Sequence, residues 1–189
     1  MSQGSLSRGS RSGPLLQLLV AAAHALAAAA CAEAPVSTPP IQAGTPDAPR
    51  DVNLIARDYA FVPTTVDLVP GETILLHVVN GGLVVHEAVF GGAATQAAWE
   101  RAEAATVGAP PGPTPVVVVA PELAGLRVVV ESGQTGDLRW TVPLDGPASP
   151  DGFLIGCHIP GHFARGMLAG VRWVGPDGVP LDGSPTDAP

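Results

Sequence analysis

Short apolar segments bounded by turn residues fill the middle of this 189-residue chain and constrain its fold more than any other feature. Valine, isoleucine, leucine and threonine dominate these segments, and pairs such as Pro70-Gly71 and Gly81-Gly82 separate them. The predicted strands are residues 52–58, 64–69, 73–80, 83–90, 116–120, 126–131, 137–142, 152–157 and 167–174. Many short strands at this spacing are typical of an antiparallel β-sandwich or barrel.

One segment departs from the strand pattern. Residues 93–106 are rich in alanine, carry Trp99 and predict a helix of about three turns. The proline-rich residues 109–115 that follow would end this helix. The sequence therefore predicts an all-β fold of about eight strands with one short helical insertion.

Composition divides the chain into four parts. We expect a signal peptide over residues 1–31, a linker rich in proline and alanine over 32–50, one folded domain over 51–175 and a flexible tail over 176–189. Apolar residues make up 46% of the chain, which is enough for the domain to bury a core.

The first part resembles an export signal. Arg8 and Arg11 precede an apolar segment, residues 15–30, that is short for a membrane span. Small residues lead into Cys31, as in a bacterial lipoprotein signal. Cleavage before Cys31 would leave a lipidated membrane tether, whereas cleavage after Ala32 would release a soluble protein, and both remain open. In either case we expect export to the periplasm or to the outer face of the cytoplasmic membrane.

Charge and cysteine content exclude several functions. The formal net charge of −8 argues against nucleic acids and anionic membrane surfaces as partners, because both require a cationic face. The two cysteines are too few for a disulfide-dense scaffold or for a zinc or iron–sulfur site with four thiolates.

A metal-binding pattern lies between the last two predicted strands. Cys157, His162 and Met167 follow the spacing C-x4-H-x4-M, with a Pro-Gly turn between the first two, and His86 lies upstream on a predicted strand. Thiolate and imidazole bind copper in a trigonal plane, and a thioether adds a long axial bond. This donor set suits an ion that changes valence with little movement.

These residues, together with the Pro-Gly-Glu-Thr turn before residues 73–80, resemble the cupredoxins, the small blue copper proteins. The loop spacing is closer to rusticyanin- and auracyanin-like members than to plastocyanin. The resemblance implies a Greek-key sandwich with one type 1 copper, His86, Cys157 and His162 as equatorial ligands, and Met167 as the axial ligand. One position departs from the family, because Glu87 stands where many members have asparagine.

Other assignments compete with this one. His77 is a rival to His86, although its mid-strand position favours a packing role. His158 directly follows Cys157, so in extended backbone its side chain points away from the metal. Zinc would accept cysteine and histidine, but methionine is a poor zinc ligand. A catalytic Cys-His pair would leave Met167 unexplained.

The implied function is one-electron transfer rather than enzymatic catalysis. We expect a monomer that meets redox partner proteins by transient contact near His162, where Ile159, Pro160, Phe163 and Ala164 would form an apolar patch. A copper enzyme would need a second copper site built from further histidines. The alternative is a copper-binding module for storage, delivery or sensing of the metal.

Overall fold

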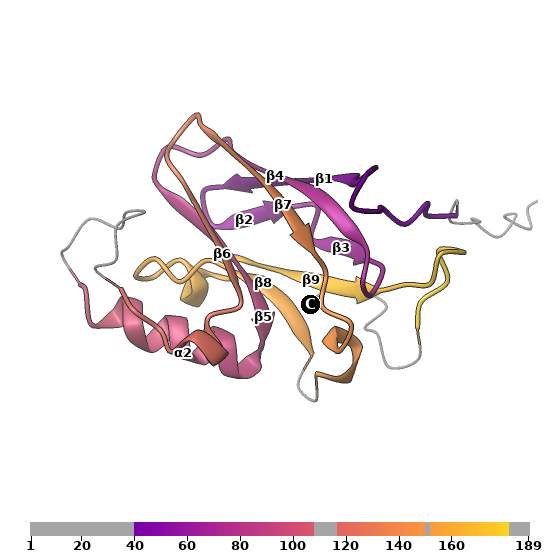
Figure 1. The fold of residues 1–189 in the computed structure, drawn as a ribbon. Coiled ribbons are helices and arrows are strands. Elements are labelled where there is room, and N and C mark those ends of the chain that lie inside the picture. The colour runs from indigo at the N-terminus through magenta and orange to yellow at the C-terminus, as the bar shows by residue number, and fades with distance from the viewer. Residues whose placement is uncertain (1–39, 108–116, 150–151, 182–189) are drawn as a thin grey trace, which may run out of the picture. The chain divides into compact units, whose positions relative to one another are not determined.

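Two β-sheets enclose a common hydrophobic core in the computed structural model, which describes residues 40–107, 117–149 and 152–181 (Figure 1). The described residues form a four-stranded sheet of order β2-β1-β4-β7 and a five-stranded sheet of order β3-β9-β8-β5-β6. The strands are β1 (Arg50–Arg57), β2 (Ala60–Val62), β3 (Thr65–Leu68), β4 (Thr73–Asn80), β5 (His86–Gly92), β6 (Leu126–Val130), β7 (Thr135–Thr141), β8 (Phe153–Gly156) and β9 (Leu168–Trp173). The predicted all-β sandwich with one helical insertion is confirmed.

The strand directions differ from the purely antiparallel prediction. β1 pairs in parallel with β4, and β3 pairs in parallel with β9, while the remaining pairs between strands are antiparallel. After β2 the chain passes to the edge of the other sheet as β3 before it returns as β4. The chain reverses direction between β1 and β2 and again before β4, so β4 runs in the same direction as β1.

Two local predictions were wrong. β2 was missed because it has three residues, too few to show an alternation, and only Phe61 points into the core. The strand predicted over 116–120 is absent from its described residues, 117–120, which precede a short 3₁₀ helix at Pro121–Leu123. Val118 is exposed there and no neighbouring strand pairs with the segment, so its apolar composition alone did not produce a strand.

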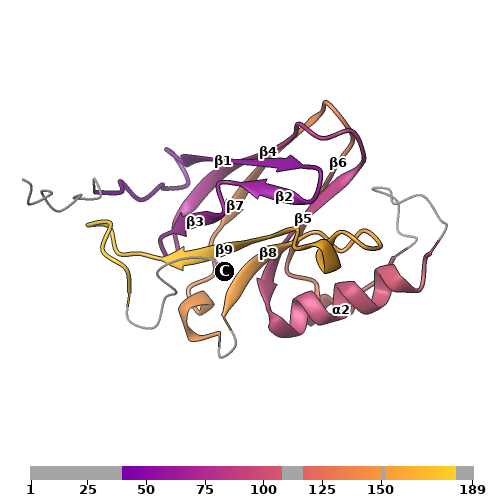
Figure 2. The same cartoon turned by 180° about the vertical axis from the view of Figure 1, so that it is seen from behind.

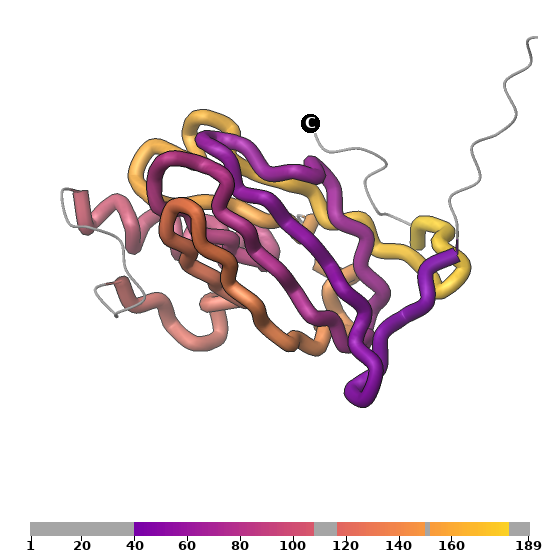
Figure 3. Tube along the Cα trace, turned by 90° about the horizontal axis from the view of Figure 1, so that it is seen from above, coloured from indigo at the N-terminus to yellow at the C-terminus, as the bar shows by residue number. Residues whose placement is uncertain are grey.

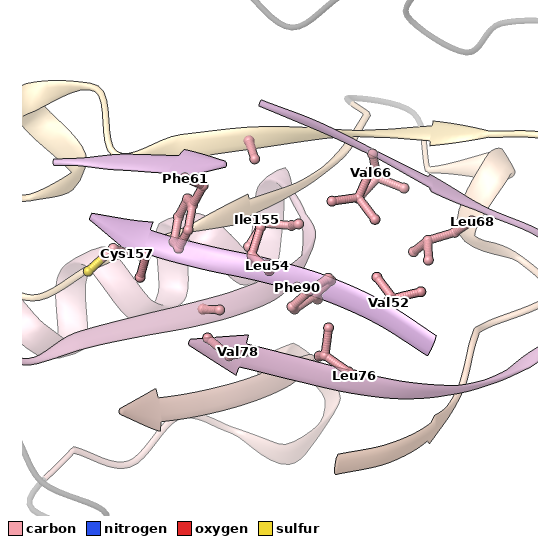
Figure 4. Close-up of a cluster of buried hydrophobic side chains, with 14 of the residues drawn as sticks. Val52, Leu54, Phe61, Val66, Leu68, Leu76, Val78, Phe90, Ile155 and Cys157 are labelled. Carbon is pink, nitrogen blue, oxygen red and sulfur yellow. The ribbon is translucent and has the colours of Figure 1, made fainter. Parts of the chain in front are cut away.

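Alternating side chains build the core, as β4 illustrates. Ile74, Leu76 and Val78 are fully buried, and the residues between them are half-buried on the other face. Figure 4 shows side chains from both sheets meeting between the layers, with Cys157 at one end of the cluster. The core therefore leads directly to the first residue of the predicted metal-binding loop.

The predicted helix, α2 (Ala93–Ala104), follows β5 without a break and lies against β5 and β8 (Figure 2). It ends two residues earlier than expected. In Figure 3, β1, β4 and β7 lie side by side across the four-stranded sheet.

The described ends of the chain are joined to the sandwich by hydrogen bonds. Thr73 N–H donates to the Gly44 carbonyl at 3.0 Å, so the last residues of the predicted linker lie against β4. At the other end, Leu181 N–H donates to the Trp173 carbonyl at 2.8 Å, which returns the first residues of the predicted tail to β9. The predicted signal peptide and Cys31 lie outside the described residues.

Candidate metal centre

The loop between β8 and β9 carries three of the four predicted ligands. Cys157 follows β8, and its N–H donates to the Met167 carbonyl at 3.1 Å; Met167 N–H in turn donates to the His162 carbonyl at 3.2 Å. Gly161 has a φ of +85°, the left-handed conformation that glycine adopts without strain, as the predicted Pro-Gly turn requires. These bonds fold the loop back on itself and bring His162 to Cys157.

His86, Cys157 and His162 converge on one point. His86 is the first residue of β5, and the candidate ligand atoms of the three side chains lie within 4.8 Å of one another. The Cys157 Sγ is 3.3 Å from His162 Nδ1, and the two imidazole ring centres are 5.1 Å apart. Within the described ranges, no other group of three or more histidine, cysteine or acidic side chains comes together in this way.

The buried state of His86 shows that the site fits a metal. Its Nε2 donates to Asp58 Oδ1 at 3.1 Å, but its Nδ1 is buried and has no hydrogen-bond partner. An unpaired buried nitrogen is costly, and a metal bound at Nδ1 would satisfy it. One thiolate and two imidazoles are the equatorial donors that copper takes in electron-transfer sites. The three residues therefore form a potential copper-binding site.

Burial favours the uncharged forms of the Cys157 thiol and the His162 imidazole. Burial raises the pKa of the Cys157 thiol to about 12, and the hydrogen bond from the Glu87 backbone N–H only partly opposes this. Burial, with the nearby His86 and Arg165, also lowers the pKa of His162. The imidazole is thus held in the neutral form that ligates metals, and a bound metal ion would displace the thiol proton.

Asp58 orients His86, and sequence analysis did not identify it. Its carboxylate accepts hydrogen bonds from Leu83 N–H at 2.9 Å and from His86, and both lower the pKa of Asp58, the Leu83 bond more strongly. At Gly82 a Cβ would lie 2.4 Å from Asp58 Oδ1 and 2.7 Å from His86 Nε2, so only glycine leaves room for this bond. Partners of this kind fix which nitrogen of a ligand histidine faces the metal.

Glu87 links the two ligand-bearing segments, although it departs from the family's asparagine. Its Oε1 accepts a hydrogen bond from His158 N–H at 2.9 Å, and its Oε2 accepts one from Arg127 Nε at 2.6 Å. The carboxylate is fully buried, and burial raises the pKa of Glu87 while the charge of Arg127 opposes this. The residue after His86 is therefore bonded directly to the residue after Cys157.

The remaining candidates occupy different places. Met167 is fully buried and its backbone bonds to that of Cys157, whereas its axial role stays a prediction. The His158 side chain points away from the cluster, as expected, and contacts α2. His77 lies outside the cluster, on β4, where it bonds to Asp137 at 2.7 Å and to Asp51 at 3.2 Å.

Tyr59 covers His162, near which the sequence predicts contact with redox partners. The His162 residue is only 7% exposed, and the Tyr59 ring lies edge-on to it with ring centres 5.2 Å apart. Tyr59 is 37% exposed and has a φ of +66°. The guanidinium carbon of Arg165 lies 4.3 Å from the centre of its ring. Such a φ is unfavourable for a bulky residue, so the surrounding contacts hold Tyr59 in place. Tyr59 lies in the turn between β1 and β2, and the sequence of the metal-binding loop does not indicate that this turn lies next to it.

Comparisons with known proteins found one curated relative and several similar solved structures. The copper-resistant cuproprotein CopI of Rubrivivax gelatinosus is 32% identical over 153 residues, which cover 79% of each chain. Among solved structures, auracyanin B is similar at 22% identity, with 74% of this chain and all of that chain covered and a TM-score of 0.49. Auracyanin from the photosynthetic bacterium Roseiflexus castenholzii is similar at 16% identity, with 66% and 97% covered and a TM-score of 0.47.

No family model matches the chain. A search of the described helices found none with the length and apolar character needed to cross a membrane. The chain shares 32% identity with the CopI cuproprotein over most of both chains, and it has a two-sheet fold and a His-Cys-His cluster. The chain therefore belongs to the cupredoxin family.

Proposed function

We propose that this protein is a one-electron carrier with a single type 1 copper ion held by His86, Cys157 and His162, and by Met167 on the axis. The observation that carries the proposal is the convergence of a buried thiol and two imidazoles, one with an unpaired nitrogen. Copper bound by these donors supplies a valence change that requires little rearrangement.

The protein's own residues would keep that rearrangement small. Asp58 and Glu87 anchor the two ligand-bearing segments by hydrogen bonds that do not depend on a metal. The three ligand residues are at most 7% exposed, so water is largely excluded from them. A fixed and dry ligand set suits rapid electron exchange, because neither the protein nor the solvent has to reorganise.

The partner surface would lie around His162. Of the four residues expected to form an apolar patch, Pro160 and Ala164 are exposed and Phe163 is half-buried, whereas Ile159 is buried in the core. Tyr59 covers the imidazole. Small apolar surfaces suit weak redox encounters. The net charge of −8 favours a basic redox partner, whose association would slow as salt increases. We expect the carrier to act as a monomer, which sedimentation of the copper-loaded protein would test.

The proposal is tested by the spectrum and redox kinetics of the copper-loaded protein. We expect an intense thiolate-to-copper absorption band and fast, reversible reduction in stopped-flow measurements. The Cys157→Ser variant should lose the band because the sulfur donor is gone. A band that survives this substitution would contradict the ligand assignment, and slow or irreversible reduction would contradict the carrier role.

A second candidate is copper handling, favoured by the similarity to a copper-resistant cuproprotein. The same ligands would then store the metal or deliver it. Rapid loss of Cu(I) to a chelator, together with slow electron exchange, would support this role over the carrier. An enzymatic role would require a second copper site built from further histidines.

We also propose that the protein is exported and works in the periplasm or on the outer face of the cytoplasmic membrane. The basic and apolar start of the chain supports an export signal, and Cys31 supports a lipid tether. Mass spectrometry of the mature N-terminus would distinguish a diacylated Cys31 from cleavage after Ala32. An uncleaved N-terminus would contradict both.

A further inference from the structure

Three features of the chain have no part in the proposed role so far: helix α2, the imidazole of His158, and the pairing of Glu87 with Arg127. They belong to one network of hydrogen bonds. The network runs from α2 to the residues that directly follow two of the copper ligands.

The first connection holds His158. Its Nε2 lies 2.6 Å from Gln96 Oε1, and its Nδ1 lies 2.8 Å from Glu100 Oε2. Both partners are on α2, one turn apart, so they present their side chains on the same face. The ring of Phe163, next to His162, stacks on the His158 ring with centres 4.7 Å apart.

Gln96 is itself fixed to both strands beneath the helix. Its Nε2 lies within hydrogen-bonding distance of three backbone carbonyls, at 3.0–3.1 Å, those of Val89, Gly91 and Leu154. These acceptors determine that the amide oxygen, and not the nitrogen, faces His158. The imidazole is therefore held by a side chain that is anchored to β5 and β8.

The second connection holds Glu87. Arg127 on β6 donates to Glu87 through Nε and to Glu103 of α2 through Nη2, the latter at 2.7 Å. The guanidinium also lies 4.5 Å from the centre of the Trp99 ring on α2. Because the Glu87 carboxylate accepts the His158 N–H, both connections end beside His86 and Cys157.

The buried surface of α2 is unusual for a helix that only covers a sheet. Its buried residues are Gln96, Ala98, Trp99 and Glu103, of which two are polar. Burying a carboxylate is costly unless it is paired and hydrogen-bonded. A covering helix would place apolar side chains there, so the polar residues point to a positioning role.

We propose that α2 is a positioning element that fixes the Cys157–Met167 loop and the start of β5 relative to each other before copper binds. This inference concerns the copper centre itself and goes beyond the electron-carrier role, because it applies equally to a storage or delivery protein. Gln96 and Glu100 are positioning residues that act through His158.

Hydrogen–deuterium exchange of the metal-free protein tests the proposal directly. In Glu100→Ala we expect faster exchange of amides in residues 157–167, because His158 loses one of its two side-chain partners. Glu100 has a side chain that is 45% exposed, so its removal should leave the fold intact. Gln96→Ala removes the other partner and should have a larger effect, with near-ultraviolet circular dichroism to verify that this variant folds.

Two matched variants act as controls. Arg101→Ala changes an exposed residue of the same helix and should exchange like the wild type. Glu100→Gln retains an acceptor oxygen for His158 and should restore most of the protection. In the copper-loaded protein, Glu100→Ala should release copper to a chelator several-fold faster than Arg101→Ala, a smaller effect than the roughly tenfold or greater loss seen when direct partners of metal ligands are removed, because Glu100 acts through His158.

The proposal is overturned if Glu100→Ala and folded Gln96→Ala match Arg101→Ala in both loop exchange and copper release. It is also overturned if Glu100→Ala accelerates exchange throughout α2 but not in residues 157–167. Neither outcome depends on electron-transfer rates. A failure of the carrier role would instead appear as slow reduction in a wild-type protein whose loop is protected.

Discussion

The proposed axial role of Met167 differs from that of the three equatorial residues, because a long thioether bond contributes weakly to copper binding but influences which valence is preferred. We expect Met167→Leu to retain copper and to raise the reduction potential, since loss of the axial sulfur weakens Cu(II) more than Cu(I). Each tenfold relative loss of Cu(II) affinity corresponds to about 59 mV. Potentiometric titration checks this, and an unchanged or lower potential would count against Met167 as the axial ligand.

The ring of Tyr59 covers His162, near which we propose that redox partners exchange electrons. In Tyr59→Ala we expect a small inorganic oxidant such as ferricyanide to react several-fold faster with the reduced protein, because the ring that covers the imidazole is removed. Tyr59→Phe retains the ring and should react like the wild type. Equal rates in all three proteins would show that electrons leave the protein by another route.

How well a residue of the site could be predicted depends on how far it lies in sequence from the Cys157–Met167 loop. Cys157, His162 and Met167 lie in one loop, so their spacing alone indicated a metal site. His86 required the family resemblance, since it is far from that loop in sequence. Asp58 and Tyr59 gave no signal, because their contact with the histidines arises from the pairing of β1 with β2.

Three strands of the four-stranded sheet are joined by one histidine. His77 on β4 bonds to Asp137 on β7 and to Asp51 on β1, and these bonds, the one to Asp137 first, raise the pKa of His77 above its usual 6.5. The protonated form therefore stabilises the fold. This contribution is complete below about pH 6.5 and is lost as pH rises through the raised pKa of the folded state.

We expect His77→Gln to lower the free energy of unfolding at pH 6 by no more than about 1 kcal/mol, the usual range for exposed ion pairs. The difference from the wild type should shrink by pH 9, where both side chains are neutral. Urea unfolding at the two pH values measures it. A difference that is constant, or that grows with pH, would show that the ion pairs are not the cause.

Individual strands and the helix were easier to predict than the strands and residues against which they pack. The alternation in β4 and the alanine-rich segment of α2 are local properties, and both elements were predicted. The parallel pairing of β1 with β4 depends on where the chain crosses between sheets, and the polar face of α2 depends on what lies beneath it. Local sequence does not contain either kind of information.

The whole molecule should gain stability from its metal. The residues of the potential copper site lie on β5 and in the β8–β9 loop, which unfolding separates, so bound copper would favour the folded state by mass action. At a free copper concentration one hundred times the dissociation constant, the gain is about 2.7 kcal/mol. Calorimetry should show a melting temperature several degrees higher with copper, and Cys157→Ser should lose most of this increase.

The first and last described segments, residues 40–49 and 174–181, lie at the end of the sandwich opposite the loop between β8 and β9, as Figures 1 and 3 show. A linker to an electrode that is joined directly before Pro40 or after Leu181 would therefore leave the molecule on the side opposite the proposed route of electrons to the copper site.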